Sequence, residues 1–240
     1  MSWRIPRWPA PPRVRAAYTT RQGGVSAGPY AGFNLAEHVG DDPSAVAANR
    51  ARLRAGLGLP AEPAWLRQVH GAAVVEAVPG PPREADGSLC RGAGQVSAVL
   101  TADCLPVLLC DRAGTVACAL HAGWRGLAAG ILEAGVAATG RPPGALLAWL
   151  GPAIGPAAFR VGEEVRAAFL DRAPEDADAF APAAGGWRAD LRALARRRLS
   201  RAGVTAVYGV TDCTYSEPDL YYSYRRDRRC GRQATLIWLA

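Results

Sequence analysis

Two apolar runs separated by a short polar connector constrain this chain more than any other stretch. Residues 96–109 and 115–120 are almost wholly apolar, and the connector DRAG stands between them at residues 111–114. Apolar runs on either side of a short glycine-containing connector predict two antiparallel strands joined by a tight turn. With the turn centred in the middle of this connector, Cys104 and His121 are directly opposed. Directly opposed side chains lie about 4.5–5.5 Å apart at Cβ.

A thiol opposite an imidazole has two chemical interpretations. Cys104 and His121 can form a nucleophile–base pair, or they can be two ligands of one metal ion. The alternative is structural, because an unpaired cysteine in an apolar strand is usually a small buried hydrophobic residue. We apply that interpretation to Cys90, Cys110, Cys118 and Cys213. Cys104 differs because it follows Asp103 and faces one of only three histidines in the chain. Pro106 weakens the pairing, since proline cannot donate to a strand ladder and is typical of an edge or a break.

The composition limits the classes of protein that this chain can be. Half of its 240 residues are hydrophobic and no repeat or polar linker divides it, so we expect a single domain over residues 1–240. No apolar run near the start predicts a signal peptide, and no stretch reaches the roughly 18 apolar residues of a membrane span. We therefore expect a cytoplasmic protein without membrane contact. The six cysteines lie mostly inside apolar runs and are expected to be reduced.

The basic residues exclude two mechanisms. All 28 of them are arginine, and the absence of lysine excludes a Schiff-base mechanism and a Walker-type phosphate loop. The net charge of +7 invites a nucleic-acid partner. However, the arginines accompany abundant alanine, glycine and proline, which indicates a GC-rich coding bias rather than a selected patch. The densest runs lie at residues 196–198 and 225–229, and we expect no nucleic-acid partner.

Turn residues and hydrophobic periodicity predict strands that alternate with helices, which is typical of the α/β class. A helix is predicted to begin after Asp42 and to end near Leu57, with Pro43 in its first turn. Residues 79–94 are rich in proline and glycine and predict an exposed loop with Asp86 near its centre. The remaining predicted helices are 127–139, 161–171 and 189–202, and the remaining predicted strands are 14–20, 65–69, 72–78, 145–150, 206–210 and 234–239.

Several motifs resemble one known family. QVHG at residues 68–71, TADCLPVLL at 101–109 and HAGWRGL at 121–127 are similar to motifs of the laccase-domain family. This family is also called the multi-copper polyphenol oxidoreductase family, and it includes a bacterial peptidoglycan-editing factor and purine nucleoside phosphorylases. The resemblance covers nearly the whole chain. It extends to TRQGGVS at 20–26, HVGDDP at 38–43, GPAIGP at 151–156, CTY at 213–215, SYRRD at 223–227 and GR at 231–232. It implies a layered sandwich of mixed β-sheets with outer helices, similar to the catalytic domain of cytotoxic necrotising factor.

The resemblance makes His70 a third candidate ligand beside Cys104 and His121. Three protein ligands with one open position are the pattern of a catalytic zinc site. A true multicopper oxidase needs many more than the three histidines present here, so the laccase name is a poor guide to activity. The same ligand set also describes a blue-copper site, which normally adds an axial methionine. Met1 is the only methionine, so Zn²⁺ is favoured. Affinity alone favours copper, so Cu²⁺ can fill the site in vitro. His38 is not included in the metal set.

The resemblance also implies purine nucleoside chemistry. The expected reactions are zinc-dependent phosphorolysis of adenosine, inosine, guanosine or methylthioadenosine, and deamination of adenosine, with nucleosides and phosphate as partners. Phosphorolysis needs a cationic cradle for phosphate, and Arg50 is the first candidate, ahead of Arg225 and Arg226. An exposed helix arginine is the alternative interpretation of Arg50. Deamination needs a proton carrier, for which Asp103 is the nearest acidic candidate, although a role in bonding turn amides explains it equally well. The HxE and PCxxC signature of zinc deaminases is absent.

The sequence also allows other functions. Cys104 with His121 as base predicts a zinc-free cysteine hydrolase, which fits the editing of peptidoglycan precursors. A copper-dependent polyphenol oxidoreductase is a further alternative. A structural zinc in a non-catalytic protein is disfavoured, because structural sites are normally closed by four ligands. The chain departs from the family pattern at 157–158 and 216–217, where cysteines are frequent in relatives; these departures can reshape the pocket.

Overall fold

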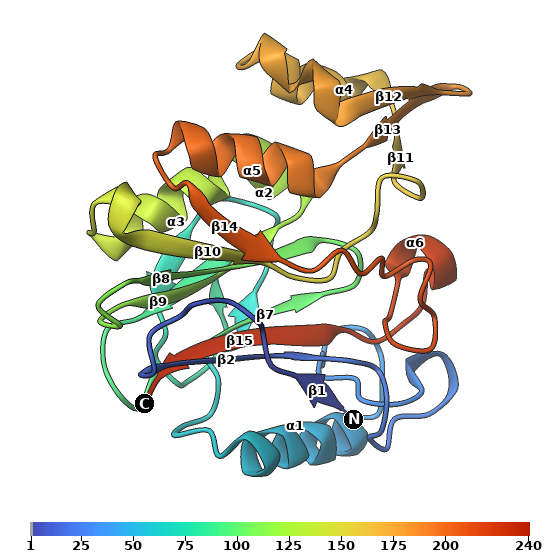
Figure 1. The fold of residues 1–240 in the computed structure, drawn as a ribbon. Coiled ribbons are helices and arrows are strands. Elements are labelled where there is room, and N and C mark those ends of the chain that lie inside the picture. The colour runs from blue at the N-terminus through green and yellow to red at the C-terminus, as the bar shows by residue number, and fades with distance from the viewer. Residues whose placement is uncertain (1) are drawn as a thin grey trace.

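The computed structural model describes residues 2–240, so Met1 lies outside the described part of the chain. Two stacked sheets form its centre, as Figure 1 shows. The first is antiparallel and consists, in spatial order, of β1 (Trp3–Arg4), β2 (Val14–Thr19), β15 (Gln233–Leu239) and β7 (Val96–Thr101). The second is mixed and consists of β14 (Ala206–Gly209), β10 (Leu146–Leu150), β8 (Leu105–Asp111), β9 (Ala117–Ala122), β6 (Gly87–Cys90) and β4 (Val74–Glu76).

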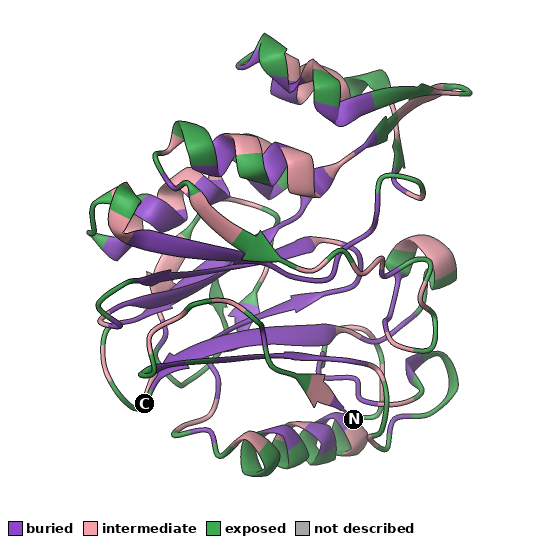
Figure 2. Ribbon diagram, in the orientation of Figure 1, coloured by how far each residue is buried: buried purple, intermediate pink, exposed green. Residues whose placement is uncertain are grey.

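Helices cover the outer side of each sheet. The four-stranded sheet packs against α1 (Pro43–Leu57), and the six-stranded sheet packs against α2 (Trp124–Ala129), α3 (Ile131–Thr139) and α5 (Leu191–Arg201). In Figure 2 the central strands β2, β15, β7, β8, β9 and β10 are buried almost throughout, whereas the helices are buried mainly on the side that faces the sheets. The predicted α/β class is therefore confirmed, in the form of one antiparallel and one mixed sheet with outer helices. The likeness to cytotoxic necrotising factor and the single-domain division stay predictions.

Smaller elements lie around this sandwich. β3 (Leu66–Arg67) pairs in parallel with β5 (Arg83–Glu84). A three-stranded sheet stands apart at the top of Figure 1, and it consists of β11 (Arg160–Val161), β13 (Gly186–Ala189) and β12 (Phe180–Ala183) beside α4 (Glu163–Leu170). The short helices are η1 (Gly28–Tyr30), η2 (Pro143–Ala145), η3 (Pro174–Ala179) and α6 (Tyr224–Asp227).

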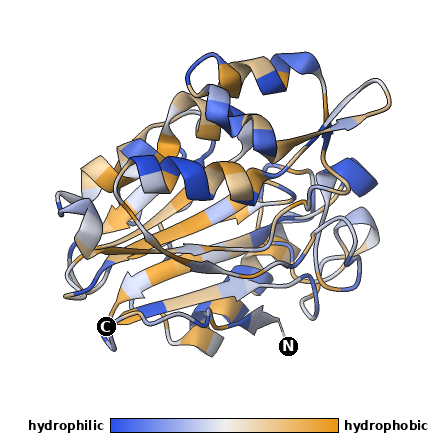
Figure 3. Cartoon of the chain, turned by 45° about the horizontal axis from the view of Figure 1, so that its top comes forward, coloured by the Kyte–Doolittle hydropathy of each residue, from blue (hydrophilic) through white to orange (hydrophobic). Residues whose placement is uncertain are grey.

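The apolar core between the two sheets holds them together. Trp149 of β10 is fully buried there, and its ring centroid lies 5.2 Å from that of Tyr18 in β2. Aromatic pairs at this separation contribute about 0.5–1.5 kcal/mol beyond their buried area. The hydroxyl of Ser97 in β7 also donates to the carbonyl of Ser88 in β6 at 2.7 Å, so that a polar contact crosses the gap. Figure 3 shows the apolar strands inside and the hydrophilic residues mainly on helices and loops.

The prediction of one continuous strand over residues 96–109 is wrong. The stretch divides at residues 102–104, and its halves, β7 and β8, belong to different sheets. Asp103 adopts φ of 95°, a conformation that turns the chain from one sheet to the other. Pro106 is the second residue of β8, so the break that proline indicated lies just before it. The carbonyl of Pro106 accepts a hydrogen bond from the N–H of Gly151, which lies just beyond the end of β10. The nitrogen of Pro106 is directed to the same side, where no strand residue needs a hydrogen bond from it, so the N–H that proline lacks is not missed.

The predicted β8–β9 hairpin is present, but its register is shifted by two residues. His121 is opposite Pro106, and continuing the register places Gly123 opposite Cys104. The turn lies one residue later than predicted because Asp111 accepts the N–H groups of Thr115 and Val116 at 2.7 and 3.0 Å. Side chains along a strand alternate between faces, so a shift of two keeps Cys104 and His121 on the same face.

The helix after Asp42 is confirmed, and the Asp42 carboxylate caps it by accepting the N–H of Ser44. The single predicted helix over 127–139 is instead two helices, because Gly130 adopts φ of 102° between α2 and α3. The exposed loop predicted over 79–94 is also wrong, since it contains β5 and β6 and since Asp86 has no exposed surface. None of the helices within residues 2–240 has the length and apolar character needed to span a bilayer.

Candidate active site

The three predicted ligands come together at one end of the gap between the sheets. His70 follows β3, Cys104 stands in the connection between the two sheets, and His121 lies in β9. Their ligand atoms all lie within 4.8 Å of one another. The Cys104 sulfur is 4.0 Å from Nε2 of His70, and the two imidazole rings meet edge to face with centroids 4.8 Å apart. Among residues 2–240 this is the one cluster of histidine, cysteine and acidic side chains close enough to hold a metal ion.

The buried Asp86 carboxylate fixes two of these ligands. Its Oδ1 accepts a hydrogen bond from Nδ1 of His121 at 2.8 Å and from the backbone N–H of His70 at 2.9 Å. Its Oδ2 accepts the N–H groups of Val69 and Gly71 at 3.2 and 2.7 Å. These bonds hold the backbone of His70 at φ of 62°, which is uncommon for a residue with a side chain. They also leave Nε2 of His121 as its metal-facing nitrogen, as in carboxylate–histidine–metal arrangements.

Two glycines of the HAGWRGL motif allow these groups to approach closely. A Cβ atom added to Gly123 would lie 2.8 Å from the Cys104 sulfur and 3.2 Å from Cδ2 of His70. A Cβ atom added to Gly126 would lie 2.8 Å from the carbonyl oxygen of Gly71. At each position the 2.8 Å distance is too short for a side chain, so a residue larger than glycine would displace the neighbouring atom. The glycines are therefore part of the geometry that brings the ligands together.

The protonation states of Cys104 and His121 are coupled. Burial disfavours the Cys104 thiolate, but the positive charge and hydrogen bonds of His121, with His70, outweigh burial and lower the pKa of Cys104 to about 6. Burial likewise disfavours the His121 imidazolium, but Cys104 and Asp86 outweigh it and raise the pKa of His121 to about 9. Burial raises the pKa of Asp86, and the bonds from His121 and backbone N–H groups more than reverse that effect. The metal-free site is therefore a thiolate–imidazolium pair beside a carboxylate.

The cluster fits a zinc ion in donor chemistry and in spacing. Two imidazole nitrogens and a thiolate are preferred zinc donors, and tetrahedral coordination at normal bond lengths places such atoms about 3.3–3.6 Å apart. The ligand atoms lie within 4.8 Å of one another, so closing around an ion needs movements on the order of 1 Å. His70 is exposed and Cys104 is partly exposed, which leaves one side of the cluster open.

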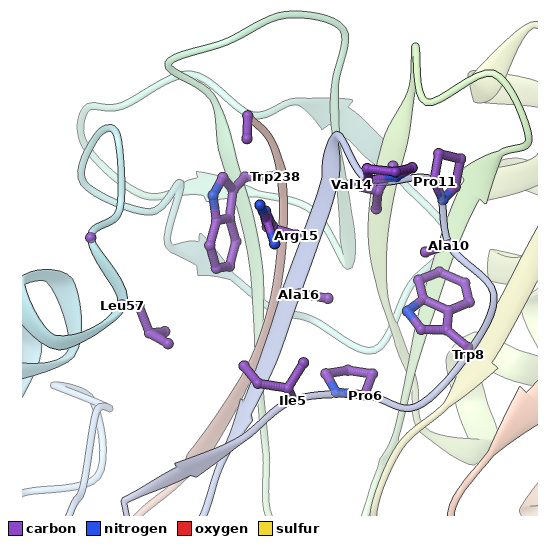
Figure 4. Close-up of a pocket in the computed structure, with 13 residues that line it drawn as sticks. Ile5, Pro6, Trp8, Ala10, Pro11, Val14, Arg15, Ala16, Leu57 and Trp238 are labelled. Carbon is purple, nitrogen blue, oxygen red and sulfur yellow. The ribbon is translucent and has the colours of Figure 1, made fainter.

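That open side faces a cavity of about 430 Å³, within the usual range of small-molecule pockets. The cavity is lined by the three ligands and by His38, Gln68, Leu100, Thr101, Ala102, Tyr224 and Arg232. A groove of about 530 Å³ lies elsewhere, beside β2. Figure 4 shows Trp8, Trp238 and several apolar residues around it, with Arg15 as its only charged side chain. It contains no histidine, cysteine or acidic residue, so the smaller cavity is the candidate site.

The predicted phosphate-binding arginines do not line this cavity. Arg50 faces an adjacent cavity that shares His38, Gln68 and Leu100 with it. The Arg50 guanidinium donates to the Leu35 carbonyl at 2.9 Å and pairs with Glu37 at 2.7 Å. Arg225 donates from its side chain to the Arg160 carbonyl, and Arg226 donates to the carbonyls of Thr214, Tyr215 and Tyr221. Their role in binding phosphate stays a prediction.

Asp103 occupies the connection rather than the cavity wall. Its Oδ1 accepts the Thr214 hydroxyl and its Oδ2 accepts the Arg225 N–H, both at 2.7 Å. These contacts favour the anchoring interpretation, and its role as a proton carrier stays a prediction. The departures at 157–158 and 216–217 are also absent from the cavity lining.

The sequence did not indicate several residues of the site. The prolines and glycines around Asp86 predicted an exposed loop, so no role in the site was assigned to it. A metal-ligating histidine usually donates to a carboxylate, and a search for that carboxylate could have found Asp86. His38, excluded from the metal set, lines the cavity without joining the cluster. Tyr224 and Arg232 stand in the SYRRD and GR motifs of the resemblance, but no role in the site was predicted for either.

Comparison with known proteins places the chain in a family. Residues 15–240 match the family described as multi-copper polyphenol oxidoreductase laccase. The chain belongs to this family. Within the laccase family, it is 54% identical over 240 residues to purine nucleoside phosphorylase PA4543 of Pseudomonas aeruginosa, covering 99% of this chain and 98% of that protein. It is 49% identical over 237 residues to purine nucleoside phosphorylase YfiH of Escherichia coli, covering 98% of each chain.

A solved structure of the laccase family has the same fold. The crystal structure of Neisseria meningitidis protein NMB0706 gives a TM-score of 0.96 at 50% identity, and the match covers 100% of this chain and 99% of that one. The family resemblance inferred from the motifs is thus confirmed, and the names of the relatives support an enzyme of the purine nucleoside phosphorylase type.

Proposed function

We propose that the cavity beside His70, Cys104 and His121 binds a purine nucleoside and hydrogen phosphate and catalyses phosphorolysis of the glycosidic bond. The observation that carries this proposal is the ligand cluster on the wall of a cavity. It is supported by sequence identities of 54% and 49%, along almost the whole chain, to proteins named purine nucleoside phosphorylase. The proposed substrates are adenosine, inosine, guanosine and methylthioadenosine, and the proposed ion is zinc.

The residues of the cavity suit a nucleoside. Tyr224 is 49% exposed at the edge of the cavity and offers a flat apolar ring to a purine base. His70, Cys104 and His121 would hold the zinc ion. When bound, the ion supplies a positive charge that polarises a substrate group in its open position. Asp86 keeps His121 in one tautomer and His70 in its left-handed conformation, so the site is formed before substrate arrives.

The reaction balances without a further acid. An oxygen of hydrogen phosphate attacks C1′, the C1′–N9 bond breaks, and its electron pair leaves with the purine. The proton carried by hydrogen phosphate ends on the purine nitrogen, so adenosine and hydrogen phosphate give adenine and ribose 1-phosphate. Deamination, which needs an activated water instead, stays a prediction.

Product analysis tests this proposal directly. Purified protein, stripped by a chelator and reloaded with zinc, should convert adenosine to adenine and ribose 1-phosphate only when phosphate is present. Cys104→Ala should abolish turnover and stoichiometric zinc, whereas Cys213→Ala, at another partly exposed cysteine outside the cavity, should preserve both. Free ribose as the product would identify a hydrolase, and inosine would identify a deaminase. No product from any of the four nucleosides would refute the proposal.

A cysteine hydrolase acting on peptidoglycan precursors is the second candidate. The specific observation in its favour is the lowered pKa of Cys104 beside the raised pKa of His121, because reactive cysteines are stabilised as thiolates by such neighbours. The metal-free protein separates the candidates. Hydrolysis that persists after chelation and stops after alkylation of Cys104 would favour the cysteine mechanism, whereas activity that returns only with zinc favours the metal site.

A further inference from the structure

An arginine without an ion pair lines the cavity. Arg232 directly precedes β15, whose Gln233 is paired with Thr101 of β7, so Arg232 stands close to the connection that carries Cys104. One terminal nitrogen of its guanidinium donates to the carbonyls of Cys230 and Gly231 at 2.9 and 3.0 Å. No carboxylate of residues 2–240 lies within ion-pair distance of it. Its charge is therefore oriented but not neutralised by the protein.

The segment that carries His38 is hydrogen-bonded to the backbone of Arg232. The carbonyl of Arg232 accepts the N–H of Leu35 at 3.3 Å, and the N–H of Arg232 donates to the side chain of Asn34 at 2.8 Å. These bonds fix the start of the segment that carries His38 into the cavity wall. Burial and then the positive charges of Arg232 and Arg50 lower the pKa of His38, so it is a neutral hydrogen-bond donor at pH 7.

A buried hydroxyl on the same wall also lacks a partner. Thr101 is 1% exposed, lines the cavity, and its hydroxyl makes no hydrogen bond within the described residues. A buried hydroxyl without a partner costs about 1–3 kcal/mol, so most are paired, and a ligand or water is one of the partners that an exception on a cavity wall can take. This observation is independent of the arginine, and it points to the same wall.

Arg50 differs from Arg232 in its ion pair and in the cavity that it faces. It is already paired with Glu37 and faces the adjacent cavity. Both guanidinium groups lie over an aromatic ring, Arg50 over Trp65 at 4.3 Å and Arg232 over Tyr224 at 5.8 Å from the ring centroid. An anion at Arg50 would compete with a carboxylate that is in place. An anion at Arg232 would instead meet an uncompensated charge in the cavity that holds the ligand cluster.

We infer that Arg232, His38 and Thr101 form the anion subsite of this cavity and hold the hydrogen phosphate that attacks the nucleoside. This inference rests on the proposed phosphorolysis for its reaction but not for its ligand. A guanidinium with free N–H groups offers phosphate two-point, charge-assisted hydrogen bonds. The imidazole of His38 can add one donor, and the Thr101 hydroxyl can add another once a side-chain rotation uncovers its buried oxygen. The nucleoside then occupies the part of the cavity nearer the ligand cluster, and Tyr224, whose ring lies beside the Arg232 guanidinium, stands between the two parts.

Kinetics in phosphate titrations provide the first test. Arg232→Gln should raise the KM for phosphate about ten- to a hundred-fold, with little change in the KM for adenosine and with full zinc content. Arg232→Lys, which keeps the charge but loses the two-point geometry, should fall between Arg232→Gln and the wild type. Thr101→Val should raise the same KM by a smaller factor. The control is Arg188→Gln, which removes an equal charge from an exposed position in the three-stranded sheet and should leave every constant unchanged.

Binding of inorganic phosphate alone provides the second test. Calorimetric titration with phosphate should show one site in the zinc-loaded wild type and in Arg188→Gln, and a site weakened at least ten-fold in Arg232→Gln. If Arg232→Gln does not fold, Arg232→Lys takes its place in both tests. Phosphate binding that depends on Arg232 without any phosphorolysis would leave the subsite standing and remove the proposed function. Phosphorolysis with a wild-type KM for phosphate in the Arg232 variants, or a raised KM only in Arg50→Gln, would overturn the subsite.

Discussion

Asp86→Asn should show how much the zinc site depends on a residue that holds the ligands in place without binding the metal ion itself. The Asp86 carboxylate accepts four N–H groups, two at each oxygen. An asparagine has one acceptor oxygen, so in either orientation its NH₂ group faces two donors that have lost their acceptor. In one orientation the hydrogen bonds from Nδ1 of His121 and the N–H of His70 are lost. In the other orientation the hydrogen bonds from the N–H groups of Val69 and Gly71 are lost.

The expected effect is large because the residue is fully buried. Hydrogen bonds to charged groups contribute about 1.5–3 kcal/mol each, so losing two removes about 3–6 kcal/mol. A typical protein has only about 5–15 kcal/mol of stability in total. Loss of the carboxylate behind a metal-ligating histidine typically weakens metal binding by about ten- to a hundred-fold. The free energy of unfolding and the zinc affinity should therefore both decrease.

Two measurements check this prediction. Urea unfolding followed by tryptophan fluorescence gives the free energy of unfolding, and competition with a chromophoric chelator gives the zinc affinity. Asp111→Asn is the matched control, because Asp111 is a buried carboxylate at the opposite end of the same hairpin. Its two backbone donors share one oxygen, and the other oxygen accepts the Thr115 hydroxyl, which can rotate. Asparagine can therefore satisfy all three and loses only the 3.6 Å ion pair with the half-exposed Arg141, so zinc affinity should not change. Wild-type zinc affinity in Asp86→Asn would refute the reasoning.

In the metal-free protein the alkylation rate of Cys104 should increase as pH passes about 6 and level off above it, since the thiolate is the reactive form; an inflection near the ordinary thiol value of 9 in an iodoacetamide rate profile would contradict the proposed ion pair. Gly123→Ala should weaken zinc binding about ten-fold or more while circular dichroism shows an unchanged fold, because its Cβ would lie 2.8 Å from the Cys104 sulfur; unchanged affinity would mean that the sulfur moves freely. Oxidation of phenols should be slow and should require added copper, because the described residues offer one three-ligand cluster; fast turnover by protein carrying several copper ions would contradict this.

Local patterns predicted the elements well but not their partners. The apolar runs and the Asp111–Gly114 connector were sufficient for the β8–β9 hairpin, and the cap at Asp42 was sufficient for α1. The register was missed because it depends on which N–H groups the Asp111 carboxylate accepts, and a connector of that composition allows more than one turn. The division of residues 96–109 was missed because both halves are equally apolar. Only long-range pairing with β15 or with β9 and β10 distinguishes them.

The same distinction applies to the site. His70, Cys104 and His121 stand in short motifs that the family resemblance made visible, and the structure brings them together. Asp86, His38 and Arg232 reach the site through tertiary contacts from distant segments. Asp86 lies among prolines and glycines that indicated a loop. His38 and Arg232 stand in motifs of the family resemblance, but those motifs did not indicate which of their residues face the cavity.

The division of the chain at residues 102–104 places the cysteine ligand between strands of two different sheets. Cys104 lies three residues after β7 of the four-stranded sheet and directly before β8 of the six-stranded sheet, in which β8 pairs with the strand that carries His121. The sulfur and the imidazole are therefore attached to neighbouring strands of one sheet, and residues 102–104 join them to the end of β7. The Ser97–Ser88 contact, buried between the sheets, ties the two sheets together independently of the site. Zinc bound by Cys104 and His121 would fasten this connection to β9, and it should slow amide hydrogen exchange most at the adjoining ends of β7, β8 and β9.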